Sequence, residues 1–598
     1  MTSRPGAEAL TDRAPSAEPL VRFDSLDPAR GPRSLRFSGH RATLAADGLA
    51  EVLPVLQRVE EAVSRGLHAA GFLAYEAAPA FDPALAVHPA DPRLPLAWFA
   101  LFEAREEVPA LQGVPDEPFS LGEWTPSLGA EAYARRVAAI RELIAAGDTY
   151  QVNFTLRLDA AFAGSDLGLY GALCRAQRSA YGALLRLGGL SVVSASPELF
   201  FRWSEGELEL RPMKGTRPRG RWEDEDAALA AELVASPKER AENLMIVDLL
   251  RNDAGRVSEW GSVHVPRLFE TERYETVHQL TSTVRSRTVP GTGLADVLRA
   301  LFPSGSVTGA PKVRTMQIIR ELEDGPRGVY TGAIGFVSPG ETVFSVGIRT
   351  LLVDRARGRA ELGVGSGITY DAGAEAEYRE CLDKARFATH PPADFELLET
   401  LLWEPPGGWF LLGGHLDRMA ASARYFGFRF HEERVRAALS DTVSGSPDGP
   451  LRVRLLLARD GEVRAETSPL APTPTAPARV ALSTRPVDSR DPFLCHKTTR
   501  REVYTTRAAE RPDCDDVILV NERGEVTEST IANVVARIGG ALWTPPREAG
   551  LLPGVFRRHL LETGEVRERP LRPEDLRDAE ELYLVNSVRR WRRAELVP

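Results

Sequence analysis

Apolar positions change their period from one segment of the chain to the next, and these changes predict the secondary structure. Between Glu131 and Gly147, apolar residues recur at i, i+4, i+7 and i+11, which is typical of an amphipathic helix that ends at the glycine. The strands that shorter apolar runs predict are Tyr150–Leu158, Ala183–Leu187, Leu190–Ser194 and Leu199–Trp203, with a second series between Gly328 and Thr369. We therefore expect a sheet-rich α+β fold in this part of the chain.

Two consecutive prolines mark the main domain boundary that we predict. They lie in the segment Thr389–Asp394, directly after a predicted helix, and prolines stop a helix. We therefore predict two domains, residues 1–390 and residues 391–598. Within the second domain, the proline-rich stretch Pro469–Pro477 is typical of a linker between two lobes.

The composition excludes several classes of protein. The chain has 598 residues, of which 43% are hydrophobic and 26% charged, and its net charge of −10 comes without a long basic block; these are globular values that argue against a nucleic-acid binder. The four cysteines form no C-x-x-C pair, so we expect neither a disulfide scaffold nor a thiolate zinc site. Because Met1–Leu20 has no apolar core and no long apolar run occurs elsewhere, we expect a soluble, cytoplasmic protein with small molecules or another protein as partners.

Two predicted helices carry carboxylates in line with other functional positions. In the first, Glu242 shares a face with an apolar stripe, and in the second, Glu377, Glu380 and Lys384 share a face. If the helices approach each other, Glu242 and Glu380, with Glu377, form an all-oxygen site suited to Mg²⁺. Each helix alone is more typical of a solvated charged face with i,i+4 pairs.

Further segments carry groups suited to a small anionic substrate. The glycine-rich segment Gly363–Ile368 lets backbone N–H groups approach an anion, and Arg349 ends a predicted strand, where it could clamp a carboxylate. Lys214 lies in a turn-rich basic segment, where neighbouring arginines and burial favour its uncharged, nucleophilic form. Glu198 opens a strand and is a candidate general acid. Taken singly, these features are more typical of ordinary turns, surface arginines and solvated loops.

Six motifs in a fixed order are more specific together than any one of them. They are Tyr150–Asn153, Ser196–Glu198, Pro212–Thr216, Glu242–Leu249, Gly309–Lys312 and Gly365–Gly367. Through this set, residues 20–390 resemble the chorismate-utilising enzymes, and most closely component I of the aminodeoxychorismate synthases. The resemblance implies a large β-sandwich-type domain with helices on the outside.

The resemblance also implies which reaction the first domain performs. Isochorismate- and salicylate-forming relatives carry a water-activating lysine where this chain has Gln151, and anthranilate synthases usually carry alanine where it has Lys214. The combination resembles the aminodeoxychorismate enzymes, in which this lysine attacks ring carbon 2 while the acid, here Glu198, helps the 4-hydroxyl to leave. Ammonia then enters at carbon 4 and expels the lysine.

The same resemblance implies the rest of the site. Glu242 and Glu380, with Glu377 beside them, are expected to hold Mg²⁺ on the ring carboxylate. The residues expected to contact the substrate are Arg349, Tyr330, Gly365, Ser366 and Gly367 at the enolpyruvyl carboxylate, and Gln151, Thr308 and Lys384 elsewhere in the pocket. His278 matches a catalytic histidine of the family, although the bare sequence favours a core histidine.

The second domain carries a different set of motifs. They are His415–Met419, Phe493–Arg501, Val526–Val534, Leu552–Val555 and Asn586–Ser587. Together they resemble the fold-type IV pyridoxal-phosphate enzymes, particularly aminodeoxychorismate lyase and its aminotransferase relatives, which are usually homodimers. The resemblance implies a two-lobed domain in which Lys497 holds the cofactor pyridoxal 5'-phosphate and Glu528 keeps its pyridine nitrogen protonated. The phosphate-binding positions that it implies are Arg418, Ile531, Ala532, Val555 and Ser587.

The two resemblances together predict a bifunctional enzyme that makes 4-aminobenzoate, a folate precursor, from chorismate. The first half is expected to act as a synthase and the second as a lyase. The chain has no Gly-x-Cys-x-Gly nucleophile elbow, so we expect a separate glutamine amidotransferase subunit to supply ammonia. Three alternatives stay open: an aminotransferase as the second half, a non-catalytic docking module in its place, and an anthranilate synthase as the first half.

Overall fold

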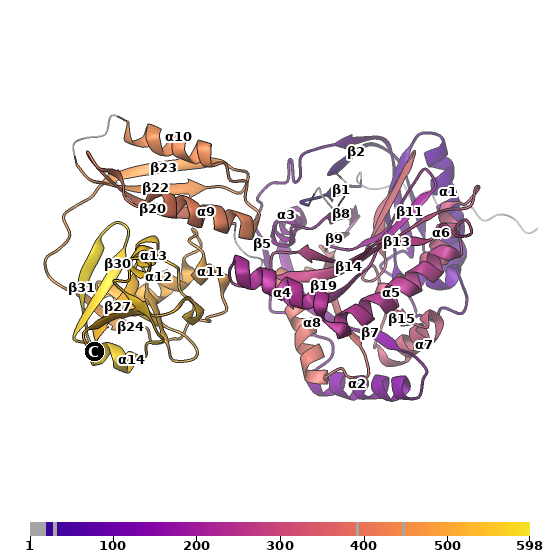
Figure 1. Ribbon diagram of the computed structural model, residues 1–598. Helices are drawn as coiled ribbons and strands as arrows, with labels where there is room; N and C mark the ends of the chain where they lie inside the picture. Colours follow the sequence, from indigo (N-terminus) through magenta and orange to yellow (C-terminus); the bar gives the residue numbers. More distant parts are fainter. Residues whose placement is uncertain (1–18, 28–30, 32, 390–393, 445–448) are drawn as a thin grey trace, which may run out of the picture. The chain divides into compact units, whose positions relative to one another are not determined.

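The computed structural model describes residues 19–27, 31, 33–389, 394–444 and 449–598. Its contacts divide the chain into two units (Figure 1), the first being Met1–Pro218 with Ala230–Pro392 and the second Arg219–Leu229 with Ala393–Pro598. The predicted domains, 1–390 and 391–598, differ from this division at residues 219–229. Most of the predicted boundary segment, residues 390–393, and residues 1–18 of the N-terminal segment lie outside the described residues.

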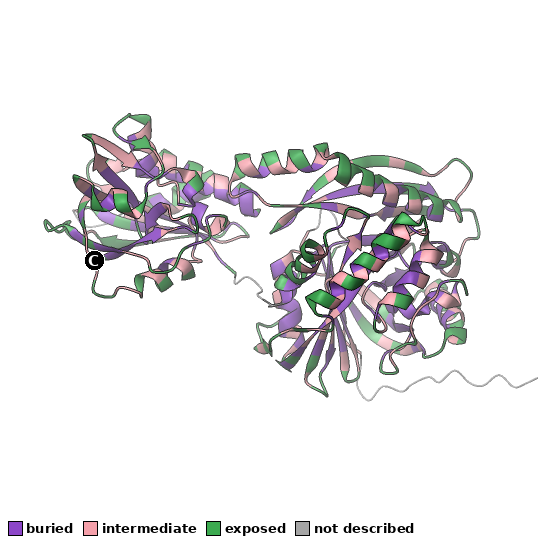
Figure 2. Cartoon of the chain, turned by 90° about the horizontal axis from the view of Figure 1, so that it is seen from below, coloured by how far each residue is buried: buried purple, intermediate pink, exposed green. Residues whose placement is uncertain are grey.

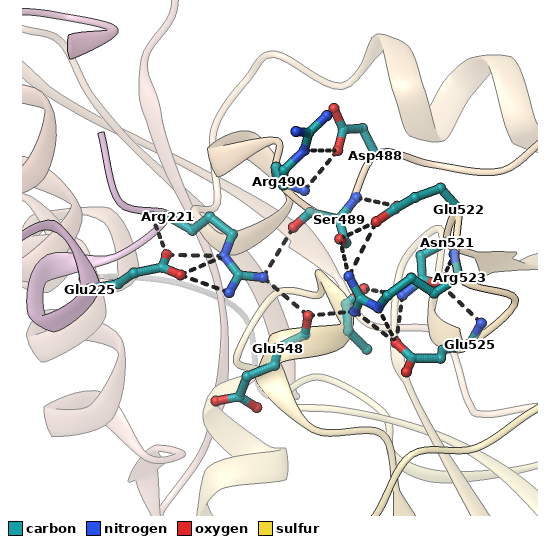
Figure 3. A network of polar contacts seen from close by, with 11 residues as sticks. Arg221, Glu225, Asp488, Ser489, Arg490, Asn521, Glu522, Arg523, Glu525 and Glu548 are labelled. Carbon is teal, nitrogen blue, oxygen red and sulfur yellow. Dashed lines mark hydrogen bonds and ion pairs between the residues drawn. The ribbon is translucent and has the colours of Figure 1, made fainter. Parts of the chain in front are cut away.

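Residues 219–229 group with the second unit because their polar groups bond to residues of that unit. The Tyr425 hydroxyl donates a hydrogen bond to the Gly220 carbonyl oxygen at 2.6 Å. Figure 3 shows Arg221 donating to the carbonyl oxygens of Ser489 and Glu548, at 3.3 and 3.1 Å. A short insertion of this kind leaves no signal in composition, which is why contiguous domains were predicted.

The first unit is built from a large, mainly antiparallel sheet system and surrounding helices. Its main strands are β1 (Val21–Asp24), β2 (Leu35–Ala46), β3 (His68–Leu73), β4 (Ala97–Glu107), β7 (Gln151–Gly164), β8 (Tyr181–Leu187), β9 (Leu190–Ser196), β10 (Leu199–Ser204), β11 (Glu207–Arg211), β12 (Met213–Pro218), β13 (His264–Arg273), β14 (Val277–Arg287), β16 (Ala333–Ser338), β17 (Glu341–Val346), β18 (Thr350–Asp354) and β19 (Arg359–Ile368). Its main helices are α1 (Leu49–Ser64), α2 (Ala130–Ala145), α3 (Asp166–Gln177), α5 (Pro237–Gly255), α6 (Leu294–Leu301), α7 (Lys312–Leu322) and α8 (Ala374–Thr389).

Successive residues of a strand face opposite sides, and this alternation makes two kinds of core. Phe72 of β3 packs with Phe23 of β1 and Phe336 of β16 in a cluster made of sheet residues, whereas Ala69 and Leu73 of β3 join a cluster that includes α1 and α6. The first kind of cluster is the interior of a sandwich, and the second covers it with helices, whose outer faces are exposed (Figure 2). The predicted β-sandwich with helices on the outside is therefore confirmed.

Helix α2 and strand β7 show how far the apolar pattern determines the elements. The predicted helix at residues 131–147 is α2, and its buried residues Tyr133, Val137 and Ile140 follow the expected period. The strand predicted from Tyr150 is β7, which continues beyond the expected end to Gly164. The longer strand reflects pairing with β19 over ten positions, from Ala161 with Arg359 to Val152 with Ile368.

The glycine-rich segment Gly363–Ile368 is part of strand β19 and not a turn between strands. Gly363, Gly365 and Gly367 lie two residues apart, so they share one face of the strand and leave it without side chains. Strand β18 pairs with β19 at Arg359–Leu362, whereas the pairing with β7 continues to Ile368. Beyond Leu362, one edge of β19 therefore presents backbone groups that β18 does not cover.

Lys214 lies in a strand, β12, and not in the turn-rich loop that its prolines and glycine suggested. β12 pairs with β14, with Met213 opposite Thr281 and Thr216 opposite Gln279. Between these pairs, two residues of β12, Lys214 and Gly215, lie opposite one residue of β14, Leu280. This two-to-one arrangement is a β-bulge. Gly215 has φ of 105°, a conformation that favours glycine. Bulges redirect side chains and recur beside active sites.

A buried ion pair holds several of these elements together. Arg327 donates to both carboxylate oxygens of Glu323, at 3.0 and 2.7 Å, and to the carbonyl oxygens of Val307 and Asn153 at 2.9 and 2.8 Å. The Arg327 and Glu323 side chains are 1% and 4% exposed. Glu323 also accepts from the Thr155 amide at 2.9 Å, so the pair fixes β7 to the segments before and after α7.

The second unit has two lobes, as predicted. In the described residues, the smaller has the strand order β21-β20-β22-β23 and the larger the order β26-β25-β24-β31-β30-β27-β28-β29. The strands are β20 (Leu397–Glu404), β21 (Gly408–Trp409), β22 (Leu451–Leu457), β23 (Val463–Pro469), β24 (Ala478–Leu482), β25 (Asp516–Val520), β26 (Val526–Ser529), β27 (Asn533–Ile538), β28 (Ala541–Thr544), β29 (Arg567–Glu568), β30 (Glu581–Asn586) and β31 (Arg590–Leu596). The helices are α9 (Leu412–Phe426), α10 (Glu432–Val443), α11 (Pro492–Cys495), α12 (Glu502–Ala508), α13 (Val555–Glu562) and α14 (Pro573–Arg577). The predicted linker at Pro469–Pro477 joins β23 to β24.

Two observations bear on the expectations from composition. Cys174, Cys381, Cys495 and Cys514 are free thiols. Among the described residues, no helix combines the length and the apolar character needed to cross a membrane.

Replacing Arg327 with methionine should destabilise the first unit, because the Glu323 carboxylate would stay buried without its partner. Removing one partner of a buried pair typically costs about 3–5 kcal/mol. Urea unfolding followed by tryptophan fluorescence measures the shift of the transition. Arg299→Met is the control, since Arg299 pairs with Asp296 at exposed positions and should lose less than about 1 kcal/mol. Equal midpoints for the two variants would contradict the assigned role of Arg327.

Candidate active sites

A cavity of about 250 Å³ in the first unit collects most of the predicted residues. Those that line it are Glu198, Lys214, Glu242, Tyr330, Arg349, Gly365, Ser366, Gly367, Glu377, Glu380 and Lys384. They come from β12, β19, α5, α8 and the segments next to β10 and β17, so residues far apart in the sequence meet here. These predicted residues therefore line one cavity of the structure.

The amine of Lys214 lies against the glycine face of β19. A Cβ added at Gly367 would lie 2.3 Å from Lys214 Nζ and 2.5 Å from Gln151 Nε2. Gln151 is fully buried, and neither its Nε2 nor its Oε1 has a hydrogen-bond partner among the described residues. Buried amides normally have partners, so this amide and the adjacent amine form a place where a ligand's polar groups would be bonded.

The charges around Lys214 differ from the expected ones. Arg211 pairs with Glu272, and Arg217 pairs with Glu239 at 3.5 Å, so the neighbouring arginines face carboxylates of their own. The charged group next to Lys214 is Glu242, whose Oε2 lies 3.6 Å from Nζ. Lys214 therefore sits beside a carboxylate and not in the cluster of positive charge that the sequence suggested.

Glu198 has the properties of a proton donor near neutral pH. Burial raises the pKa of its carboxyl to about 7, although a hydrogen bond from Ser306 and the charge of Lys214 act in the opposite direction. The side chain lies on the cavity wall with Lys214. A carboxylic acid whose pKa is close to the working pH can hold a proton and still release it.

The two acidic helices meet at this cavity. Glu242 of α5 and Glu377 and Glu380 of α8 all line it. Burial raises the pKa of Glu377. Burial also acts to raise the pKa of Glu380, but the charge and hydrogen bond of Lys384 outweigh it, and the pKa of Glu380 is lowered. Lys384 Nζ lies 2.6 Å from Glu380 Oε1.

These carboxylates do not form a complete metal site by themselves. Among the described residues, no group of three or more His, Cys, Asp or Glu side chains is arranged to hold a metal ion. Mg²⁺, however, is commonly held by one or two carboxylates together with substrate oxygens and water. Glu242 and Glu380 fit that role, in which the ion and a substrate carboxylate would arrive together.

The opposite wall carries groups suited to a carboxylate. Arg349 follows β17, is half-buried, donates to the side-chain oxygen of Gln177 and has φ of 49°, a strained conformation for a non-glycine residue that often marks a functional position. A Cβ at Gly363 would overlap the Tyr330 ring at 2.2 Å, so the bare strand also seats this ring. Lys384 donates to the Gly365 carbonyl oxygen at 3.0 Å. Arg349 and the uncovered edge of β19 thus face one cavity.

Three predicted residues, Gln151, His278 and Thr308, do not line the cavity. His278 is buried on β14, but its neighbour Gln279 lines the cavity, because successive strand residues face opposite sides. Thr308 is fully buried, and its hydroxyl donates to the Ser304 carbonyl oxygen at 3.0 Å. Ser306 and Val307 line the cavity instead. In the segments around His278 and Thr308, the family motifs therefore lie next to the cavity, but neighbouring residues and not the predicted ones line its wall.

A second cavity, of about 560 Å³, lies in the second unit and is lined by all the residues predicted to bind pyridoxal phosphate. They are Arg418, Lys497, Glu528, Ile531, Ala532, Val555 and Ser587. Burial lowers the pKa of Lys497 to about 8, and the charge of Arg418 acts in the same direction. An amine with this pKa is readily deprotonated, as an amine that bonds to an aldehyde must be.

Glu528 and the start of α13 fit the two ends of the cofactor. Burial raises the pKa of Glu528 to about 7, and the carboxyl accepts from the Tyr504 hydroxyl at 2.8 Å and the Leu552 amide at 3.0 Å. A cationic ring nitrogen against this carboxyl would stabilise its ionised form. At the other end, Gly554 and Val555 begin α13, where free backbone N–H groups suit a phosphate.

Arg418 is bound by a carboxylate that the sequence analysis did not single out. Its Nε and Nη2 donate to the two oxygens of Glu399, at 2.8 and 2.7 Å, and His415 Nδ1 lies 2.7 Å from Glu399 Oε2. Despite burial, Arg418 and His415 lower the pKa of Glu399 to about 2. The sequence does carry a sign of Glu399, because this carboxylate lies within the mainly apolar run of β20. Tyr504, which bonds Glu528, carried no comparable signal.

Comparisons with known proteins agree with this division. Residues 26–390, well over half of the chain, match the family model of the chorismate binding enzymes. The chain belongs to the chorismate-binding enzyme family. Residues 396–597 match the model of the class IV aminotransferases. The two cavities of this chorismate-binding enzyme thus lie in the stretches that the two models cover.

Individual relatives support the family and leave the reaction open. The aminodeoxychorismate synthase component 1 of Klebsiella aerogenes is 44% identical over 268 residues, which are 45% of this chain and 59% of that protein. The anthranilate synthase component 1 of Streptomyces coelicolor is 45% identical over 44% of this chain and 52% of that protein. The chain thus spans between half and three fifths of the length of these relatives. The crystal structure of anthranilate synthase component I from Streptococcus pneumoniae is 27% identical, with a TM-score of 0.51 over 65% of this chain and 95% of that one.

Gly367→Ala should lower turnover of chorismate by about 100-fold and leave the fold intact. The three atoms nearest the new Cβ belong to the ends of the Lys214 and Gln151 side chains, so these would move aside, and misplacing a reacting group by about 1 Å can cost about 100-fold in rate. Gly373→Ala is the control, since its Cβ would meet nothing closer than Ala376 at 4.0 Å. Rates are measured by loss of chorismate, with circular dichroism as the check on folding. Undiminished turnover by Gly367→Ala would contradict the placement of the amine.

Chorismate turnover should fall as the pH rises through about 7, because Glu198 acts as an acid and its pKa is raised to about 7. Below this pH the carboxyl holds its proton, and above it the proton is lost. kcat/KM is measured across the pH range at a constant concentration of free ammonia. Glu198→Gln should lower kcat by about 100- to 10,000-fold and remove this limb of the profile. The same limb in the variant would assign the titration to another group.

Proposed function

We propose that the chain makes 4-aminobenzoate from chorismate in two steps, one in each unit. The first unit aminates chorismate to 4-amino-4-deoxychorismate through a covalent bond to Lys214. The second unit then removes pyruvate. The observation that carries this proposal is the lysine amine against Gly367 in a cavity that also holds the buried acid Glu198. A relative with alanine at this position would lack the nucleophile.

In the first step, each side chain of the cavity has one task. Lys214 Nζ bonds to ring carbon 2, the ring double bonds shift, and the bond from carbon 4 to its hydroxyl oxygen breaks. Glu198 gives its proton to that oxygen, which leaves as water. Ammonia then bonds to carbon 4 and the bond to Lys214 breaks, so two easier displacements replace one. Before attack, Lys214 gives up a proton to solvent, and Glu242, whose Oε2 lies 3.6 Å from Nζ, keeps its carboxylate free for the metal ion.

Binding groups at the two ends of the cavity orient the ring. Arg349 and the uncovered edge of β19 bind the enolpyruvyl carboxylate by charge-assisted hydrogen bonds. Glu242 and Glu380 would hold Mg²⁺, which would offset the repulsion between the ring carboxylate and the protein's own carboxylates. Tyr330 and Ser366 line the same cavity and would contact the enolpyruvyl carboxylate.

The nitrogen reaches the cavity as ammonia from a separate glutamine amidotransferase subunit. The relative from Klebsiella aerogenes is named component 1 of its synthase, which fits a reaction shared between chains. Free ammonium replaces the subunit in a test tube, because the first unit needs ammonia itself and not glutamine.

In the second step, Lys497 and Glu528 support a bound pyridoxal phosphate. The cofactor supplies an electron sink for the carbon that bears the substrate's amine. Lys497, whose pKa burial lowers to about 8, takes the proton from carbon 4 as the free amine, and the bond from carbon 3 to the enolpyruvyl oxygen breaks, so that the enol leaves as pyruvate and the ring becomes aromatic. Glu528 would lie against the ring nitrogen, and the start of α13 with Ser587 would hold the phosphate.

Chorismate, ammonium, Mg²⁺ and pyridoxal phosphate should suffice for 4-aminobenzoate and pyruvate to form in equal amounts. The products are separated by chromatography and identified by mass. Lys214→Ala should lose all 4-aminobenzoate formation, whereas Lys497→Ala should accumulate aminodeoxychorismate. Formation of 2-aminobenzoate would identify an anthranilate synthase. Accumulation of aminodeoxychorismate by the unaltered protein would disprove the lyase step.

A further inference from the structure

The cavity of the second unit carries more positive charge than its cofactor requires. The cationic residues that line it are Arg418, Arg452, Arg454, Lys497, Arg501, Arg589 and Arg592, whereas Glu528 is the single carboxylate in the same lining. A bound phosphate contributes about two negative charges. The remaining excess favours a substrate that is itself an anion.

Arg452 and Arg454 reach this cavity from one face of β22. Val453 and Leu455, which alternate with them, pack into the core of the smaller lobe, so the two arginines project from the opposite face. On the adjacent strand β20, Thr400 lies opposite Arg454 and lines the same cavity. The alternation of charged and apolar residues in β22 thus directs both guanidinium groups to the cavity.

The other arginines of the cavity already have partners. Arg418 binds Glu399, Arg501 donates to the Thr530 carbonyl oxygen, and Arg592 lies 3.2 Å from Asp515. Arg589 donates to the Ala471 carbonyl oxygen. These groups shape the wall, and their charges are partly or wholly engaged.

Arg454 differs from these four in having neither an ion pair nor a carbonyl partner among the described residues. Its Nε is buried and has no hydrogen-bond partner there; the Nε of Arg592 also has none, but Arg592 pairs with Asp515 through Nη2. Glu466 lies opposite Arg454 on β23, but it is exposed and does not line the cavity. A buried guanidinium N–H without an acceptor is unfavourable, and it is satisfied when a ligand brings an oxygen to this position.

The strand register places Arg454 away from the reacting amine. The Leu398 amide of β20 donates to the Lys497 carbonyl oxygen, and Thr400, two residues further along β20, faces Arg454 on the other side of that strand. Two strand spacings and two residues of rise correspond to roughly 12 Å between the backbones of Lys497 and Arg454. Long side chains from the two positions can therefore reach opposite ends of one small ring.

We propose that Arg454, with Arg452 beside it, is a carboxylate subsite that selects amines whose carboxylate is remote from the amino group. The inference rests on the proposed function, because it assumes that the substrate's amine reacts at Lys497. Aminodeoxychorismate carries a ring carboxylate across the ring from its amine. An ordinary α-amino acid carries its carboxylate on the same carbon as the amine and does not reach this subsite. The subsite thus favours the lyase substrate over those of an aminotransferase.

Binding of two probes to the full-length holoenzyme tests this subsite without turnover. 4-Aminobenzoate and its neutral amide, 4-aminobenzamide, differ in the charge of the group across the ring. The unaltered protein should bind the acid at least about tenfold more tightly, as expected for a charge-assisted hydrogen bond, and Arg454→Met should remove this preference. Arg454→Lys should retain part of it. Isothermal titration calorimetry measures both dissociation constants.

Two further measurements separate the subsite from a structural role. The affinity for pyridoxal phosphate should stay unchanged in Arg454→Met, and the KM for aminodeoxychorismate should rise at least about tenfold with little change in kcat. Arg464→Met is the control, because Arg464 pairs with Glu396 at 2.7 Å and does not line the cavity. An unchanged preference for the acid in Arg454→Met, or an equal loss of cofactor affinity, would overturn the proposal. If the unaltered protein shows the preference but does not turn over aminodeoxychorismate, the proposed function fails and the subsite stands.

Discussion

The close approach of the Lys214 amine to the backbone of Gly367 is the constraint on which the first cavity depends. A side chain of any size at position 367 would occupy the place of the amine. The approach requires a bulge in β12 that turns Lys214 toward β19, and it requires glycines at alternate positions of β19. It also requires that β19 stay paired with β7 on its other edge, because a strand without side chains on one face contributes little packing of its own. Helices α5 and α8 can then place their carboxylates over this bare surface.

Burial is the largest cause of the shifted carboxyl pKa in both cavities. Glu198 and Glu528 lie in different cavities, and desolvation raises the pKa of each to about 7. The two carboxyls nevertheless serve different ends. In the proposed reaction Glu198 faces the leaving hydroxyl, and its raised pKa suits a proton donor. Glu528 faces the place of a cationic ring, which would draw it back to its ionised form. The same physical effect thus supports an acid in one unit and a counter-ion in the other.

The sequence predicted those features that depend on local pattern. The period of α2, the face of α8 that carries Glu377 and Glu380, and the ordered motifs of both cavities could be recognised from residue types and spacing. Features that depend on pairing between distant segments could not. Lys214 lies between prolines and next to a glycine, which favours a turn, and only the pairing of β12 with β14 makes the segment a bulged strand. The side of β14 that faces the cavity, Gln279 and not His278, follows from a register that no single strand reveals. Residues 219–229 join the second unit through hydrogen bonds to positions more than 200 residues away.

Under the proposed function, the two cavities would bind closely related carboxylates by different means. The first cavity has carboxylates of its own in Glu242, Glu377 and Glu380 and cations in Lys214, Lys238, Arg349 and Lys384. Because the three glutamates repel a ring carboxylate that enters beside them, a bridging cation would favour its binding there. The second cavity has a surplus of arginines and needs no metal ion to bind the same group. Burial, with the charges of Arg418 and Arg501, lowers the pKa of Lys497, so other arginines of the same wall help to deprotonate the base. The proposed metal-bridged anion in the first unit and the directly bound anion in the second thus follow from the charges that each cavity already carries.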